Sequence, residues 1–224
     1  YSVLHLKEVF SKWDSAFATN GWLSIVLANH DQARLVSRFG NDKPEFRDLS
    51  SKMLTTFLLS MRGTPYYYYG DELGMTNAGF EKIEDYKDMP TLNEYQHQIN
   101  IGGDIKKYME FIKFSCRDNG RTGMQWDSSA NAGFTTGIPW LKTNSNYKTL
   151  NVSAQEKDEN SCLNYFKKMV KLRKDNDVLV YGRFTQIDKN NPDVFAYTRE
   201  LNEKKFLVLL NFRNKQAAVN TVID

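Results

Sequence analysis

The 224-residue chain is predicted to be an α/β protein that ends in antiparallel β-structure. Up to about residue 75, helical and strand-like apolar patterns alternate, which is typical of a parallel sheet. After residue 176 the apolar residues recur with period two, which is typical of antiparallel strands. Residues 75–160, rich in Asp, Asn, Gly and Thr, are too long for a plain connection and indicate an elaborated functional loop region with short helices.

The individual elements follow from the same patterns. Asn20-Gly21 ends the first helix, and Gly63-Thr64-Pro65 separates the second helix from a tyrosine-rich strand. In chain order we expect a helix over residues 3–17, a strand over 22–28, a helix over 45–60, a strand over 66–69, helices over 104–114 and 158–175, and strands over 178–187, 194–201, 205–212 and 217–223.

Composition argues against several classes of partner. The net charge of +3 is too small to indicate a nucleic-acid partner, and the basic run at 167–174 lies on the solvated face of an expected amphipathic helix. No stretch is long enough to span a membrane. The spacing of Cys116 and Cys162 indicates no metal site, and free thiols are favoured over a disulfide. No cofactor is implied.

Residues 29–34, with the sequence Asn-His-Asp-Gln-Ala-Arg, are the most informative segment. They follow the apolar run at 22–28, so their polar side chains emerge where a buried strand should end. In parallel α/β proteins that end of a strand is where chemistry occurs. A carboxylate beside an imidazole there can bind hydroxyls and face a developing positive charge. The alternative is a polar turn stabilised by its own Asn side chain.

Three further segments follow in register, at residues 63–75, 117–127 and 131–140. They contain Gly-Asp-Glu-Leu-Gly, Arg-Asp-Asn-Gly-Arg and Asn-Ala-Gly-Phe. In this order and spacing the four segments resemble the alpha-amylase superfamily of glycoside hydrolases. The nearest branch is that of the alpha-glucosidases and oligo-1,6-glucosidases, and the resemblance runs over nearly the whole chain.

The resemblance implies an eight-stranded (β/α)8 TIM barrel followed by a small β-domain. This chain is too short to hold both, so we expect a C-terminal fragment. Residues 1–175 would be the last two βα units of the catalytic barrel with the long loop region 75–160. Residues 176–224 would be part of the C-terminal all-β domain.

The resemblance also assigns roles to the site residues. Retaining glycosidases use a nucleophile and a general acid/base, and their transition state resembles an oxocarbenium ion. Asp31 would be a third carboxylate that stabilises this state, and His30 would bind the sugar of an oligosaccharide substrate. Arg121 and Arg117 would orient carboxylates or sugar hydroxyls, since guanidinium groups bind both well. The alternatives are a structural histidine and loop salt bridges.

Other polar residues near these motifs are expected to be structural. We expect Arg34 to brace its own loop through an ion pair, and Asp71 and Glu72 not to act as acid or nucleophile. The family usually has proline at the positions of Ala33 and Gly123, so both site loops gain backbone freedom.

No segment matches the family's nucleophile and general-acid motifs, so the chain alone is expected to be inactive. Exposed strand edges favour self-association. Four alternatives stay open: a trehalose-6-phosphate hydrolase, an isomaltulose-forming sucrose isomerase, a non-catalytic barrel homologue and a stand-alone sugar-binding domain. Arg-Asp-Asn-Gly-Arg favours a hydrolase over an isomerase, and the intact His30, Asp31 and Arg121 favour an enzyme.

Overall fold

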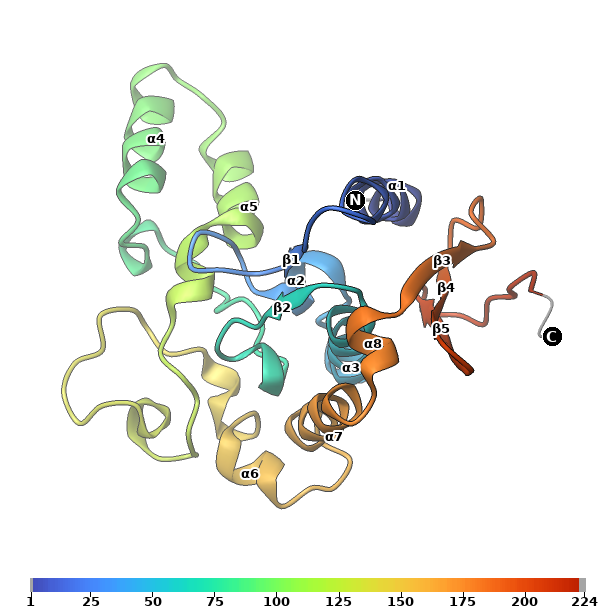
Figure 1. Cartoon of the computed structure of the whole chain (residues 1–224). Helices are drawn as coiled ribbons and strands as arrows, with labels where there is room; N and C mark the ends of the chain where they lie inside the picture. The colour runs from blue at the N-terminus through green and yellow to red at the C-terminus, as the bar shows by residue number, and fades with distance from the viewer. Residues whose placement is uncertain (1, 222–224) are drawn as a thin grey trace.

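A computed structural model describes residues 2–221 of the chain (Figure 1). Short helices and turns surround a small parallel sheet, and an antiparallel sheet lies at the C-terminal end. The helices are α1 (Val3–Ala16), α2 (Leu35–Phe39), α3 (Pro44–Ser60), α4 (Met89–Asn100), α5 (Ile105–Ser115), α6 (Val152–Glu156), α7 (Cys162–Lys174) and α8 (Asp177–Tyr181). The strands are β1 (Ser24–Val26), β2 (Thr64–Tyr66), β3 (Arg183–Ile187), β4 (Val194–Leu201) and β5 (Lys204–Asn211).

The two strands of the first half pair in parallel, as expected from the alternating pattern, but β2 covers residues 64–66 and not the expected 66–69. Ile25 of β1 is opposite Pro65 of β2. The crossover between them is α3, which begins with Pro44 in its first turn, where the missing N–H costs nothing. The short helix α2, at residues 35–39, was not expected, because one and a half turns are too short to show a period.

The loop region contains a helical hairpin, α4 and α5, that projects from the rest of the molecule (Figure 1). Asp88 caps α4 and Asp104 caps α5, each accepting a backbone N–H from three residues further on. The Tyr108 hydroxyl donates to the Thr91 carbonyl at 2.8 Å and joins the two helices. Sequence analysis located α5 but missed α4, although Met89, Leu92, Tyr95 and Ile99 recur there at helical spacing. The remaining short 3-10 helices are η1 (Asp71–Leu73), η2 (Ile83–Asp85), η3 (Arg117–Arg121), η4 (Ala130–Gly133) and η5 (Ser145–Lys148).

The antiparallel sheet has the strand order β3-β4-β5. The expected strand over residues 178–187 is wrong in its first part, because residues 177–181 form α8. Val178 and Leu179 of this turn are both buried, and Gly182 ends it. No strand forms over residues 217–221, and the remainder of that expected strand lies outside the described residues.

A shared apolar core joins the sheet to the first half of the chain. Phe57 of α3 lies 4.8 Å from the Phe10 ring and 5.5 Å from the Phe195 ring, measured between centroids. Two buried arginines also stabilise this junction. They donate to carbonyl groups in the last turn of α3, which have no N–H partner within the helix because the helix ends there. Arg173 donates to Leu59 O at 2.8 Å, and Arg199 donates to Ser60 O.

Two predictions about single features can be checked directly. Cys116 and Cys162 are both buried and both free, as favoured from the sequence. Within residues 2–221, no helix is both long enough and apolar enough to cross a bilayer.

Candidate functional site

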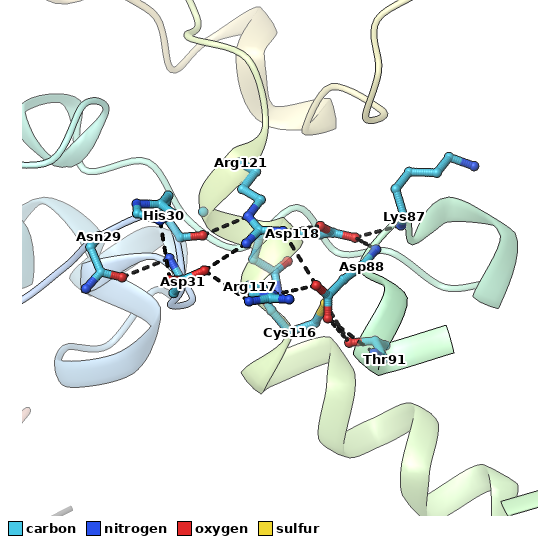
Figure 2. Close-up of polar contacts among 12 residues, drawn as sticks. Asn29, His30, Asp31, Lys87, Asp88, Thr91, Cys116, Arg117, Asp118 and Arg121 are labelled. Carbon is cyan, nitrogen blue, oxygen red and sulfur yellow. Dashed lines mark hydrogen bonds and ion pairs between the residues drawn. The ribbon is translucent and has the colours of Figure 1, made fainter. Parts of the chain in front are cut away.

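Three segments from distant parts of the sequence meet just beyond the end of β1 (Figure 2). They are the turn at residues 29–34, the residues 87–91 that begin α4, and η3 at 117–121. The first turn is shaped by Asn29, whose side-chain oxygen accepts the Asp31 N–H at 2.8 Å. This bond directs the Asp31 carboxylate toward η3.

Asp31 lies between two guanidinium groups. Its Oδ1 accepts from Arg121 Nη2 at 2.8 Å and from Arg117 Nη1 at 3.1 Å. Its Oδ2 lies 3.3 Å from His30 Nε2. The side chain remains 51% exposed, so a ligand can still reach it. The three residues that sequence analysis grouped with Asp31 therefore all lie within contact distance of it.

The surroundings of Asp31 favour its ionised form. Loss of hydration raises the pKa of this carboxyl, but His30, Arg121 and Arg117 together outweigh that effect and hold the pKa below its ordinary value. Asp31 is therefore a carboxylate at neutral pH, a state that can accept sugar hydroxyls and stabilise a nearby positive charge.

Arg121 also fixes the position of the turn that carries Asp31. Its Nε donates to the His30 carbonyl at 2.8 Å, so one guanidinium group holds both the backbone and the carboxylate of the turn. Arg117 reaches Asp31 from the other end of η3. Arg117 and Arg121 lie at opposite ends of η3, so their guanidinium groups approach Asp31 Oδ1 from two directions.

Sequence analysis missed two acidic residues of this site. Asp88 contacts both arginines, Arg117 through Nε and Arg121 through Nη1 at 3.5 Å. Asp118 is fully buried, and its Oδ2 accepts the backbone N–H groups of Lys87 and Asp88 at 2.7 and 2.8 Å. Asp88 could have been recognised as a helix cap, because Asp followed by Pro90 and Thr91 is a helix-start pattern, but its contact with η3 could not.

Arg34 was expected to make an ion pair within its own loop, and this prediction is wrong. The side chain is 1% exposed and donates to carbonyls of two other loops, Tyr69 O at 2.7 Å and Asn119 O at 3.1 Å. Its Nη2 donates to both oxygen atoms of Thr122 at 3.1 Å. No carboxylate of the described residues lies within ion-pair distance of it. Arg34 connects the loops that carry these carbonyls. Buried carbonyl groups need hydrogen-bond donors, and only a long, forked side chain reaches all of them.

Asp71 and Glu72 follow β2 on the inner side of the site. Asp71 is 2% exposed, and its Oδ1 has no hydrogen-bond partner. Burial raises the pKa of Asp71 to about 7, with Arg34 opposing the change. The carboxyl also accepts the Leu35 N–H, at the beginning of α2. It therefore ties β2 to the turn that follows β1.

An aromatic pocket of about 620 Å³ adjoins the site on the side of Arg121. Gly123 forms part of its wall and lies under the Phe134 ring, and a Cβ at this position would be 2.7 Å from that ring. The pocket is lined by Tyr69, Glu72, Arg121, Gly123, Met124, Trp126, Phe134, Pro139, Trp140 and Leu141.

Among the described residues no group of acidic, histidine and cysteine side chains is arranged to hold a metal ion.

Comparison with known protein families identifies the origin of this arrangement. The family model described as the catalytic domain of alpha-amylase matches residues 1–182. The chain belongs to the alpha-amylase family. Within the family, its relatives include the oligo-1,6-glucosidase of Parageobacillus thermoglucosidasius, 48% identical over 216 residues, and that of Bacillus cereus, 49% identical over 212 residues. These alignments cover 96% and 94% of this chain.

Other relatives in the alpha-amylase family carry different names. A trehalose-6-phosphate hydrolase of Bacillus subtilis (strain 168) is 40% identical over 219 residues, or 97% of this chain and 39% of the relative. Among solved structures, the isomaltulose synthase of Klebsiella sp. LX3 matches with a TM-score of 0.92 and 38% identity, over 95% of this chain and 38% of that chain. The chain spans 38% of the length of each of the two oligo-1,6-glucosidases.

Proposed function

We propose that this chain is the C-terminal part of a retaining alpha-glucosidase, here called the parent protein, which hydrolyses alpha-glucosidic bonds of short oligosaccharides. The observation that carries the proposal is the exposed Asp31 carboxylate held by Arg121 and Arg117 at the end of a parallel strand. The high identity to oligo-1,6-glucosidases supports isomaltose-type substrates. In this account residues 1–175 are the last two units of the barrel and residues 176–224 begin the β-domain.

Each site residue then has a distinct role. Asp31 stabilises the positive charge that develops on the sugar ring, because a fixed carboxylate needs no reorganisation when that charge appears. His30, exposed beside it, donates to a sugar hydroxyl. Arg121 and Arg117 keep Asp31 ionised and orient it, and their free N–H groups can bind hydroxyls. The nucleophile and the general acid are supplied by the part of the parent protein that precedes this chain.

One face of the two-stranded sheet supports a further part of the proposal. Val26 of β1 and Tyr66 of β2 are paired on that face and are about half exposed, although the inner face of a barrel is normally filled by side chains from its other strands. We therefore expect the isolated chain to self-associate, and the parent protein to cover these residues.

The test compares two proteins on three substrates. The isolated 224-residue chain, shown to be folded by circular dichroism, and the parent protein are each incubated with isomaltose, maltose and trehalose 6-phosphate. We expect glucose release from isomaltose or maltose by the parent protein alone. Preferred cleavage of trehalose 6-phosphate would move the proposal to the phosphosugar hydrolases, which also occur among the relatives. A parent protein inactive on all three, and lacking a nucleophile Asp, would indicate a non-catalytic homologue.

A further inference from the structure

The two arginines of the site are each shared between an exposed and a buried carboxylate. Arg117 bonds Asp31 on one side and Asp88 on the other, and Arg121 does the same. Asp31 is 51% exposed, whereas Asp88 is 5% exposed. Only Asp31 is open to a substrate, so the two carboxylates have different tasks.

Asp88 is itself held rigidly. Its Oδ2 accepts the Thr91 hydroxyl at 2.7 Å and the Thr91 N–H at 3.2 Å, as the cap of α4. Its backbone N–H donates to Asp118 Oδ2 at 2.8 Å, which joins the start of α4 to η3 (Figure 2). With Oδ2 and the backbone fixed, Oδ1 can point only at the arginines.

The charges explain why a buried carboxylate is needed behind the arginines. Two guanidinium groups face the single charge of Asp31. The buried Asp118 also lies 3.6 Å from Arg121, so among the described residues Asp88 is the one buried counterion of Arg117 and one of two buried counterions of Arg121. A long arginine side chain loses rotamer entropy when it is held in place. A fixed anion on the far side orients both groups before any substrate arrives, which is the condition for strong electrostatic stabilisation of a transition state.

We propose that Asp88 is a positioning residue that holds Arg117 and Arg121 against Asp31, and that it acts on the substrate only through them. The effect on catalysis rests on the proposed function, whereas the effect on the arginines does not. The helix cap and the arginine support are two tasks of the same carboxylate, one for each oxygen atom.

The first test measures the pKa of Asp31 by carboxyl ¹³C NMR titration of the 224-residue chain, in the unchanged protein, Asp88→Asn and Asp104→Asn. Asp104 caps α5 as Asp88 caps α4 but contacts no arginine of the site among the described residues, so it is a matched control. His30, Arg117 and Arg121 are the groups that lower the pKa of Asp31. We expect Asp88→Asn to raise this pKa, because released arginines stabilise the carboxylate less, and Asp104→Asn to leave it unchanged.

The opposite result would overturn the proposal. If the arginines stay in place without Asp88, removing its negative charge leaves the pKa of Asp31 unchanged or lower. Should Asp88→Asn fail to fold, Thr91→Ala keeps the carboxylate but removes the hydroxyl that orients it. This variant is expected to raise the pKa of Asp31 by a smaller amount, and no change would count against the proposal.

The second test measures kinetics in the parent protein. Asp88→Asn is expected to lower kcat/KM by roughly 10- to 100-fold, mainly through kcat, since misplacement of a group near the reacting atoms by about 1 Å has effects of this size. Asp104→Asn should stay within about twofold of the unchanged enzyme. Equal losses in both variants would mean that Asp88 only caps its helix. An inactive parent protein with a raised Asp31 pKa in Asp88→Asn would refute the proposed function but support the role of Asp88.

Discussion

Asp71 should make the protein less stable as the pH rises through the neutral range. Burial raises the pKa of this carboxyl from an ordinary value of 3.8 to about 7, so the folded state binds its proton more tightly than the unfolded state. A group of this kind contributes its full stability below pH 4 and loses it progressively up to about pH 7. Each pH unit in that interval costs about 1.4 kcal/mol, which gives a loss of roughly 3 kcal/mol between pH 5 and pH 8.

The assay is urea unfolding, followed by circular dichroism at pH 5, 6, 7 and 8. Asp71→Asn keeps an acceptor for the Leu35 N–H but cannot ionise, so its free energy of unfolding should lack this loss. Glu203→Gln removes an exposed carboxyl from the turn before β5 and should follow the unchanged protein. If the pH dependence of Asp71→Asn runs parallel to that of the unchanged protein, the reasoning about burial is wrong.

Two further predictions concern buried side chains that connect distant segments. Phe57→Ala should lower the free energy of unfolding by about 3–5 kcal/mol, because the ring is 0% exposed and contacts both halves of the core, and the urea midpoint measures this loss. Arg34→Lys should lower the free energy of unfolding by about 2–4 kcal/mol in the same measurement, because an ammonium group cannot reach the carbonyls of Tyr69 and Asn119 together. A loss below about 0.5 kcal/mol would show that those carbonyls find other donors.

The sequence was sufficient to predict the elements that have a strong period. The crossover helix α3 and the strand β4 lie where the apolar spacing predicted them. The helix α3 buries one face against the shared core, whereas the first six residues of β4 are buried on both faces of the strand. The helix α8 was mistaken for a strand, since the four-residue apolar run at 178–181 fits either structure and tertiary packing decides between them. The helix α4 was missed although Met89, Leu92, Tyr95 and Ile99 recur at helical spacing, because the polar residues between them resemble the surrounding loop region.

The same distinction applies to the site. His30, Asp31, Arg117 and Arg121 could be grouped because the two short motifs that contain them resemble motifs of a known family. Asp88 could not be added, because it lies 29 residues before Arg117 and only the fold of α4 brings it into contact. The carbonyl contacts of Arg34 could not be predicted either. Every residue has a backbone carbonyl, so the sequence does not show which of them a side chain contacts.

The measurement that tests the central claim most directly is hydrolysis of p-nitrophenyl α-glucoside, which releases a single glucose, by the parent protein and its Asp31→Asn variant, followed by ¹H NMR to observe the first anomer of glucose released. A retaining enzyme releases α-glucose first. We expect α-glucose from the unchanged protein and a loss of about 10²- to 10³-fold in kcat for Asp31→Asn, comparable to removal of one transition-state contact. Release of β-glucose, or an Asp31→Asn variant with unchanged kcat, would contradict the assignment of this site.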